Sequence, residues 1–154
     1  NMDSQIPNAV VFEALKENKI PELEGSINLK REVSYGDSRF DIYFESGEQK
    51  GFIEVKGVTL ENNSIAMFPD APTERGAKHA REMVEAVKEG YMGVILFLIQ
   101  MKGPKIFKLN WEMDENFSKA VKFASENGVH ILAYDSIVTE NSIILDKAME
   151  IGLN

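Results

Sequence analysis

Hydrophobic and polar residues recur along the chain with two different periods, and the first segment has the helical one. In "AVVFEALKENK", Val11, Ala14 and Leu15 fall on one face of a helix. Asn8, directly before this segment, has the short polar side chain of a typical N-cap, and Pro21 lies just beyond its end. The pattern therefore predicts an amphipathic helix that is capped by Asn8 and ends before Pro21.

Two segments with the period of a strand follow. In "FDIYFES", Phe40, Ile42 and Phe44 point to one side, and the residues between them point to the other. The segment "GFIEVKGVTL" is a second strand, and "SGEQKG" between the two supplies a turn. We expect an antiparallel hairpin, in which Glu54 and Lys56 project from the same face because they are two residues apart.

The second half of the chain alternates helices with strongly apolar strands. Thr73 is a suitable N-cap for a helix that runs to Gly90, and the strand "GVILFLIQ" follows. A further amphipathic helix closed by Gly128 leads into the strand "VHILAY". The segment "ENNSIAMFPDAP" is predicted to be a loop, and the pattern after Ser136 does not decide between helix, strand and loop.

This order of elements predicts the fold class. Strands that alternate with helices, and that become almost continuously apolar later in the chain, are typical of a sheet that is partly parallel and covered on both faces. With 154 residues and 44% hydrophobic content, the chain can bury one sizeable core. We expect a single α/β domain over residues 1–154, with a central mixed β-sheet flanked by helices.

Composition narrows the possible functions. The chain has no cysteine, which excludes disulfides, thiolate zinc sites and a cysteine nucleophile. Its longest apolar run, "MGVILFLIQM", is about half of the roughly 20 residues that a membrane-spanning helix needs, and no targeting segment opens the chain. We expect a cytoplasmic protein that does not contact membranes. The net charge of −8 argues against non-specific coating of nucleic acid, although a local basic patch remains compatible with it.

The candidate chemistry lies on the predicted hairpin. Asp41 and Glu54 can lie opposite or diagonal to each other on one face, close enough to share an ion. Two carboxylates suit a hard cation such as Mg²⁺ or Mn²⁺, which takes oxygen ligands and keeps several waters. Lys56 beside them could activate water or stabilise charge on phosphoryl oxygens. The alternative interpretation is a charged strand face that is merely exposed to solvent.

An aspartate followed after a spacer by Glu-x-Lys resembles the signature of the PD-(D/E)XK nuclease superfamily, with Phe40 where that signature has proline. A longer resemblance covers residues 6–134. The segments "IPNAVVFEAL", "IPEL", "REVSYGDSRFDIYF", "FIEVKGVTL", "MFPDAPTERGAKHAREM" and "GVILFLIQ" are together similar to the sugar fermentation stimulation protein family.

This resemblance carries several expectations. It implies a DNA-binding protein with a restriction-endonuclease-like C-terminal domain, linked to the regulation of sugar (maltose) utilisation. Asp41 and Glu54 would be the metal ligands, and Lys56 would be the catalytic lysine. Family members usually carry an additional N-terminal β-barrel domain. We expect residues 1–154 to correspond to the nuclease-like domain without this barrel, and therefore to lack part of the DNA-binding surface of the family.

A second group of residues is suited to phosphate. On the helix from Thr73, the side chains of Arg75, Lys78, His79 and Glu82 form a stripe separate from the apolar one, beside the free amides of the helix N-terminus. The alternative is a solvated helix face with Thr73 as a cap only. Ser38 and Arg39, just before Asp41, could add a phosphate contact. Asp70, in the loop before the helix, could form a turn or support the metal site.

Three further residues are weaker candidates. Glu13 could bring a helix carboxylate to the metal, and Gln100 could reach the site from the end of its strand. Trp111 could stack on a base, although packing against the core is the more common role of a loop tryptophan.

Three functional classes therefore remain open. The first is a nuclease that depends on Mg²⁺ or Mn²⁺. The second is a DNA-binding regulatory module that keeps the shape of the site without turnover. The third is a structural domain with a charged hairpin, which would bind neither metal nor DNA specifically. The sequence does not distinguish DNA from RNA, and it does not define the oligomeric state.

Overall fold

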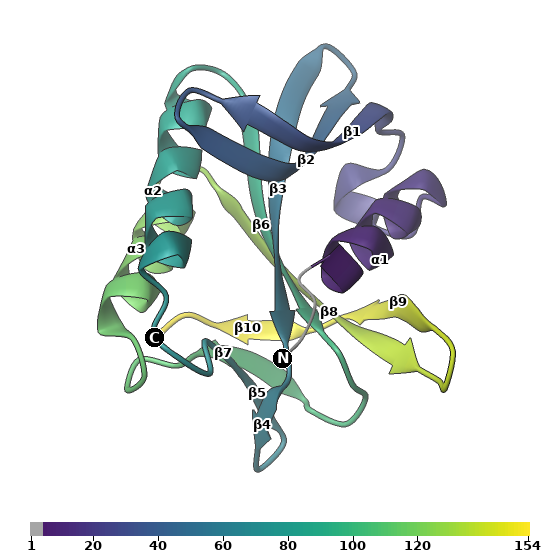
Figure 1. Ribbon diagram of the computed structural model, residues 1–154, viewed down its shortest axis with the longest axis vertical. Coiled ribbons are helices and arrows are strands. Elements are labelled where there is room, and N and C mark those ends of the chain that lie inside the picture. The colour runs from purple at the N-terminus through teal and green to yellow at the C-terminus, as the bar shows by residue number, and fades with distance from the viewer. Residues whose placement is uncertain (1–4) are drawn as a thin grey trace.

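The computed structural model describes residues 5–154 and has a six-stranded mixed sheet at its centre (Figure 1). The strand order is β1-β2-β3-β6-β8-β9. The pairs β1–β2, β2–β3 and β8–β9 are antiparallel, whereas the pairs β3–β6 and β6–β8 are parallel. The predicted fold class and the β2–β3 hairpin are confirmed. The bounds of these strands are β1 (Ile27–Tyr35), β2 (Ser38–Ser46), β3 (Gln49–Val58), β6 (Met92–Ile99), β8 (His130–Val138) and β9 (Ile143–Ala148).

Helices cover both faces of this sheet (Figure 1). The helix α1 (Gln5–Lys16) lies on one face, followed by the short 3₁₀ turn Pro21–Leu23. The helices α2 (Glu74–Lys88) and α3 (Glu115–Glu126) pack on the other face. Each face has its own apolar cluster, since side chains of β3 alternate between the two: Phe52 packs on the α2 side, and Ile53 and Val55 pack on the α1 side.

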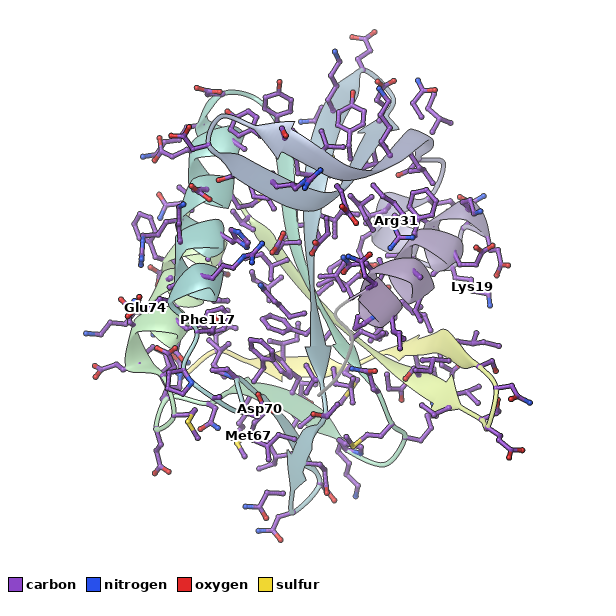
Figure 2. All side chains as sticks on the ribbon, viewed as in Figure 1. Lys19, Arg31, Met67, Asp70, Glu74 and Phe117 are labelled. Atoms are coloured by element: carbon purple, nitrogen blue, oxygen red, sulfur yellow. The ribbon has the colours of Figure 1, made fainter. Side chains whose placement is uncertain are left out.

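A second, smaller sheet underlies the α2 and α3 side, with strand order β10-β7-β5-β4. Its strands are β4 (Leu60–Asn62), β5 (Ile65–Phe68), β7 (Ile106–Leu109) and β10 (Glu150–Gly152). The prediction of a loop over "ENNSIAMFPDAP" is wrong, because Asn63 and Ser64 adopt positive φ values of 54° and 68° and close a tight hairpin between β4 and β5. Phe117, labelled in Figure 2, packs from α3 onto Phe68 of this sheet, with ring centroids 5.3 Å apart.

Both predicted ends of α2 agree with the structure, whereas the predicted start of α1 does not. The Thr73 side chain accepts a hydrogen bond from the Gly76 amide at 2.9 Å, which confirms it as the N-cap of α2. Gly90, with φ of 104°, confirms the predicted end of that helix. The prediction for Asn8 is wrong: α1 already begins at Gln5, and Asn8 lies buried inside the helix. Among residues 5–154, no helix is long and apolar enough to cross a membrane.

Candidate functional site

The candidate site lies where the β2–β3 ladder ends. Paired positions run from Ser46 and Gln49 at the turn to Ile42 and Ile53. Beyond that pair, the backbone amide of Val55 donates to Oδ2 of Asp41 at 2.8 Å. The Asp41 carboxylate thus accepts a hydrogen bond from a backbone amide of β3 where the paired register has ended. This bond holds Asp41 beside the strand that carries Glu54 and Lys56.

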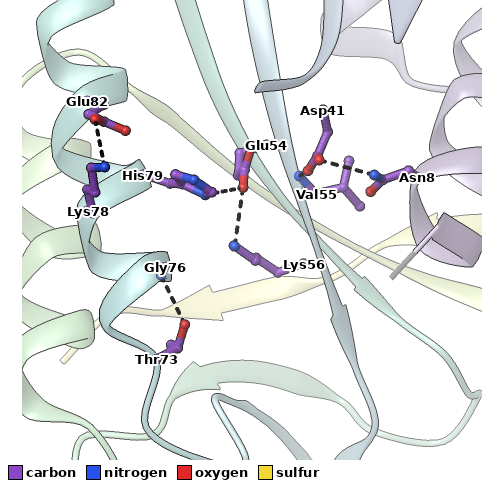
Figure 3. Close-up of polar contacts among 10 residues, drawn as sticks. All are labelled: Asn8, Asp41, Glu54, Val55, Lys56, Thr73, Gly76, Lys78, His79 and Glu82. Carbon is purple, nitrogen blue, oxygen red and sulfur yellow. Dashed lines mark hydrogen bonds and ion pairs between the residues drawn. The ribbon is translucent and has the colours of Figure 1, made fainter. Parts of the chain in front are cut away.

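Asp41 has a second partner on α1. The side-chain amide of Asn8 donates to Oδ1 of Asp41 at 3.1 Å, and Asn8 itself is buried (Figure 3). Burial, and then the negative charge of Glu54, raise the pKa of Asp41 to about 6, against the opposing effects of the Val55 amide, Lys56 and Asn8. Both oxygens of Asp41 therefore have a donor, but the carboxylate is held at an electrostatic cost.

Glu54 is only 4% exposed, and its two oxygens have different surroundings. Oε2 lies 2.7 Å from Nδ1 of His79 and 3.3 Å from the ammonium nitrogen of Lys56 (Figure 3). Oε1 is buried and has no hydrogen-bond partner within residues 5–154. Burial on its own would raise the pKa of Glu54, but the His79 hydrogen bond and the Lys56 charge outweigh it and hold that pKa below the ordinary range.

These residues line a cleft of 420 Å³ between α1 and α2. In Figure 3, Asp41 lies toward Asn8 of α1, and Glu54 lies toward His79 of α2. The cleft is mostly polar, and the predicted trio of Asp41, Glu54 and Lys56 is brought together in it. The other lining residues are Gln5, Asn8, Glu32, Arg39, Phe40, Val55, Arg75 and His79.

A groove of 760 Å³ continues from this cleft along α2. Arg39, Arg75 and His79 line both the cleft and the groove, and Ser38 and Lys78 line the groove. Five of the six residues predicted to bind phosphate therefore meet at one surface; the sixth, Thr73, serves as the helix cap. The groove also contains residues that the sequence analysis did not single out: Asp37, Glu74, Arg81 and Asn116.

The groove is mixed in charge rather than purely basic. Its lining includes four cationic side chains and three carboxylates. The cations are Arg39, Arg75, Lys78 and Arg81, and the carboxylates are Asp37, Glu74 and Glu82. The Lys78 ammonium lies 3.9 Å from a Glu82 oxygen, so part of its charge is already paired. Such a surface can contact a few phosphates at defined places, but it does not form a continuous basic track.

The weaker candidates lie outside the cleft. Glu13 is exposed and pairs with Lys16 at 3.4 Å, and Asp70 is exposed in the loop after β5 (Figure 2). Gln100 packs over Gly57 at the far end of β3, where an added Cβ on Gly57 would approach its Nε2 to 2.6 Å. Trp111 packs against the core and donates to the Leu153 carbonyl at 3.2 Å.

Two residues of the site were not foreseen in their structural role. Asn8 could have been recognised because it shares the buried helix face of Val11 and Leu15, where an unpartnered polar residue would be costly. The sequence predicts His79 on a phosphate-binding stripe separate from the apolar one, but His79 is among the buried residues of α2 and is only 9% exposed. No local signal in the sequence joins it to Glu54, because 25 residues separate them.

The donor set suits a particular kind of ion. In the part of the chain that the structure describes, no three His, Cys, Asp or Glu residues are arranged to enclose a metal ion. Two carboxylates in an open cleft instead fit a hard cation that keeps waters, such as Mg²⁺, or one that accepts phosphate oxygens as further ligands. The buried free oxygen Oε1 of Glu54 is the position from which such an ion would be held.

The fold and the cleft together define a mixed α/β domain in which the buried Glu54 and the partly buried Asp41 lie beside a partly basic groove. The family model described as "Sugar fermentation stimulation protein RE domain" matches residues 5–142. The chain therefore belongs to the sugar fermentation stimulation protein family.

Similar proteins agree with this assignment. A sugar fermentation stimulation protein homolog from Alkaliphilus oremlandii is 64% identical to this chain, over 98% of this chain and 66% of the relative. Another, from Clostridium botulinum strain Langeland, is 52% identical, over 99% of this chain and 67% of the relative. The chain thus spans about two thirds of the length of these curated relatives. The solved structure of Pyrococcus furiosus SfsA in complex with Ca²⁺ matches with a TM-score of 0.90 and 28% identity, over 97% of this chain and 65% of that one.

Proposed function

We propose that this domain is a nuclease of the PD-(D/E)XK type, which binds Mg²⁺ or Mn²⁺ through Asp41 and Glu54 and hydrolyses phosphodiester bonds. The observation that carries the proposal is the buried Oε1 of Glu54, an acceptor with no partner in residues 5–154. A buried carboxylate oxygen without a hydrogen bond is costly unless a ligand completes it. The Ca²⁺ complex of the Pyrococcus furiosus protein supports a cation at this fold.

The remaining residues of the cleft have roles that follow from their charge and position. A bound ion would polarise a phosphoryl oxygen and lower the pKa of a coordinated water. The Lys56 ammonium, 3.3 Å from Glu54, lies where it can donate to a phosphoryl oxygen or orient the attacking water. Arg39 and Arg75 line both the cleft and the groove and can hold the flanking phosphates.

The first experiment is a calorimetric titration of the protein with Mn²⁺. We expect saturable binding to the wild type and none to Asp41→Ala or Glu54→Ala, with the exposed Glu48→Ala as the matched control. Cleavage of duplex DNA, single-stranded DNA and RNA of one sequence would follow, with Mg²⁺, with Mn²⁺ and with a chelator. Lack of Mn²⁺ binding by a folded wild type, or binding that is indifferent to both substitutions, would contradict the proposal.

A second candidate function is DNA binding without turnover, in a regulator of sugar utilisation as the family name suggests. The groove favours it, because Lys78 and Arg81 of α2 line the groove but not the cleft that holds Asp41 and Glu54. The variant Lys56→Ala separates the two functions. A nuclease would lose cleavage and keep most of its DNA affinity, whereas a binding module would show metal-independent affinity and no cleavage even in the wild type.

A further inference from the structure

We propose that His79 is a positioning residue that fixes the Glu54 carboxylate with a single oxygen directed to the metal, and that it thereby sets both the affinity and the ion preference of the cleft. The inference rests on the proposed function, since it concerns the same cation site. The observation behind it is the unequal division of hydrogen bonds between the two oxygens of Glu54.

The position of His79 is itself fixed. It lies in the second turn of α2, whose first turn is capped by Thr73, and its neighbours Ala80 and Met83 are buried against the sheet. The His79 side chain is 11% exposed and has two rotatable bonds, so holding it in place costs little conformational entropy compared with a long side chain. Its Nδ1 therefore forms a well-defined contact with Oε2 of Glu54 at 2.7 Å.

Lys56 cannot provide the same restraint. Its ammonium is 3.3 Å from the same Oε2, but it sits at the end of a flexible four-carbon stem. In the proposed reaction, this ammonium also turns toward a phosphoryl oxygen. His79 is then the donor that remains on Oε2, and it prevents the carboxylate from rotating when Lys56 moves.

The consequence for the ion is geometric. With Oε2 occupied by His79, Glu54 offers Oε1 alone, so it binds as a monodentate ligand. Mg²⁺ requires near-octahedral geometry at short distances, whereas Ca²⁺ takes six to eight oxygens and readily accepts both oxygens of one carboxylate. A carboxylate held in the monodentate form therefore favours the smaller ions, and one released from His79 could bind Ca²⁺ through both oxygens.

The test compares His79→Leu, which removes the donor, with His79→Asn, whose amide nitrogen can replace Nδ1. Calorimetric titrations with Mn²⁺ and with Ca²⁺ would be made at one fixed pH on the 154-residue chain. We expect His79→Leu to lose roughly 10- to 100-fold in Mn²⁺ affinity, the usual effect of removing a hydrogen bond to a metal ligand. We expect its Ca²⁺ affinity to change by less than about threefold, because a freed carboxylate can bind Ca²⁺ through both oxygens.

His79→Asn should recover most of the Mn²⁺ affinity. Lys88→Ala is the matched control, since Lys88 also lies on α2, is exposed and pairs with Glu85 at 3.6 Å, outside the cleft and the groove. Denaturant unfolding of each variant distinguishes a positioning role from a packing role. If His79 acted only by packing, its substitution would lower the free energy of unfolding and weaken the binding of Mn²⁺ and Ca²⁺ together, and His79→Asn would not recover Mn²⁺ affinity.

Three distinct outcomes would overturn the inference. Wild-type affinity for Mn²⁺ in a folded His79→Leu protein, with Asp41→Ala still abolishing binding, would contradict the role of His79 and leave the proposed function intact. Parallel loss of Mn²⁺ and Ca²⁺ affinity in both His79 variants would assign His79 to packing. Absence of Mn²⁺ binding by the wild type would remove the proposed function, and this inference with it.

Discussion

At the scale of single residues, Asp41 shows the electrostatic cost of holding a carboxylate in the cleft. Its carboxylate is partly buried and lies near a second carboxylate, and its pKa is raised from 3.8 to about 6. A group whose pKa is higher in the folded state than in the unfolded chain destabilises the fold when it is ionised. The cost appears as the pH rises above about 4 and is complete above about 6.

The variant Asp41→Asn should therefore be more stable than the wild type in the absence of metal. At pH 7 to 8 we expect a gain of about 1–3 kcal/mol, since each pKa unit corresponds to about 1.4 kcal/mol. The gain should shrink as the pH falls toward 4, because the wild-type carboxylate becomes neutral. Denaturant unfolding with a chelator across this pH range measures it.

The control for this experiment is Asp70→Asn, at an exposed aspartate in the loop after β5. We expect its unfolding free energy to differ from that of the wild type by less than about 0.5 kcal/mol at every pH. A constant difference between Asp41→Asn and the wild type from pH 4 to pH 8 would show that the ionisation of Asp41 carries no cost.

The three residues on the hairpin could be predicted from the sequence, but the helix residues that hydrogen-bond to the two carboxylates could not. Asp41, Glu54 and Lys56 could be predicted because they fall at neighbouring positions of two adjacent strands. The expected alternation does not continue along β2, since Phe40 packs in the cluster on the α2 side whereas Ile42 and Phe44 pack in the cluster on the α1 side. Asn8 and His79 could not, since they reach the site from helices on opposite faces of the sheet. Their contacts depend on how α1 and α2 dock, which no local period encodes. Their roles in metal binding stay predictions.

At the scale of elements, one aspartate joins the starts of two helices. Asp114 accepts from the Phe117 amide at 2.9 Å and so caps α3, and its other oxygen accepts from the Thr73 amide at 2.7 Å, next to the start of α2. We expect Asp114→Ala to cost about 2–3 kcal/mol of stability, the sum of a lost cap and a lost charged hydrogen bond.

Denaturant unfolding of Asp114→Ala, Thr73→Ala and Glu112→Ala would test this link. Thr73→Ala removes only one cap and should cost about 1 kcal/mol. Glu112→Ala alters an exposed residue of the same loop and should be close to neutral. Equal losses for Asp114→Ala and Thr73→Ala would contradict the double role of Asp114.

Gly57 allows α1 to approach β3 closely. A Cβ at this position would lie 2.8 Å from Cγ of Pro7, the residue before Asn8, and 2.6 Å from Nε2 of Gln100. Gln100 can move aside, but the proline ring cannot. We expect Gly57→Ala to cost about 1–3 kcal/mol by overpacking.

The same change should also weaken Mn²⁺ binding, because displacement of α1 moves Asn8 away from Asp41. Calorimetry and unfolding measure the two effects. The matched control is Gly152→Ala, where the nearest contact would be an ordinary 3.4 Å to Lys108. Unchanged stability in Gly57→Ala would show that α1 has room to shift.

Two physical reasons explain why the sequence pattern did not predict certain strands. β1 is an edge strand with mostly exposed side chains, including Lys30, Arg31 and Glu32, so it has no apolar alternation to detect. Strands β4 and β10 have three residues each, which is shorter than any reliable period. The long strand β6 and the helices α2 and α3 were predicted because their apolar faces are buried.

At the scale of the whole molecule, the question is how a chain with a net charge of −8 would bind nucleic acid. The groove along α2 gathers four cations, and Arg75 and Lys78 lie on its helix wall. Each neutralised phosphate of a duplex contributes about −0.9 to the slope of log affinity against log salt concentration. We therefore expect Arg75→Ala/Lys78→Ala to weaken DNA binding and to reduce the steepness of this slope by about two.

The control is Lys88→Ala/Lys119→Ala, which removes the same charge from exposed positions outside the groove. Fluorescence anisotropy at several salt concentrations would compare the two double variants. Equal weakening of both would mean that only net charge matters and that the groove is not the binding surface.

The hydrogen bond that ends the β2–β3 ladder also gives the molecule a built-in spectroscopic probe. The amide proton of Val55 is held by the Asp41 carboxylate, whereas Ile53, two residues earlier, sits opposite Ile42 within the paired register. In a ¹H–¹⁵N correlation spectrum, the Val55 resonance would shift when Asp41 gains a proton or a cation, and the Ile53 resonance would serve as its internal reference. One backbone signal of the ¹⁵N-enriched protein would thus record the occupancy of the cleft without an attached dye or spin label.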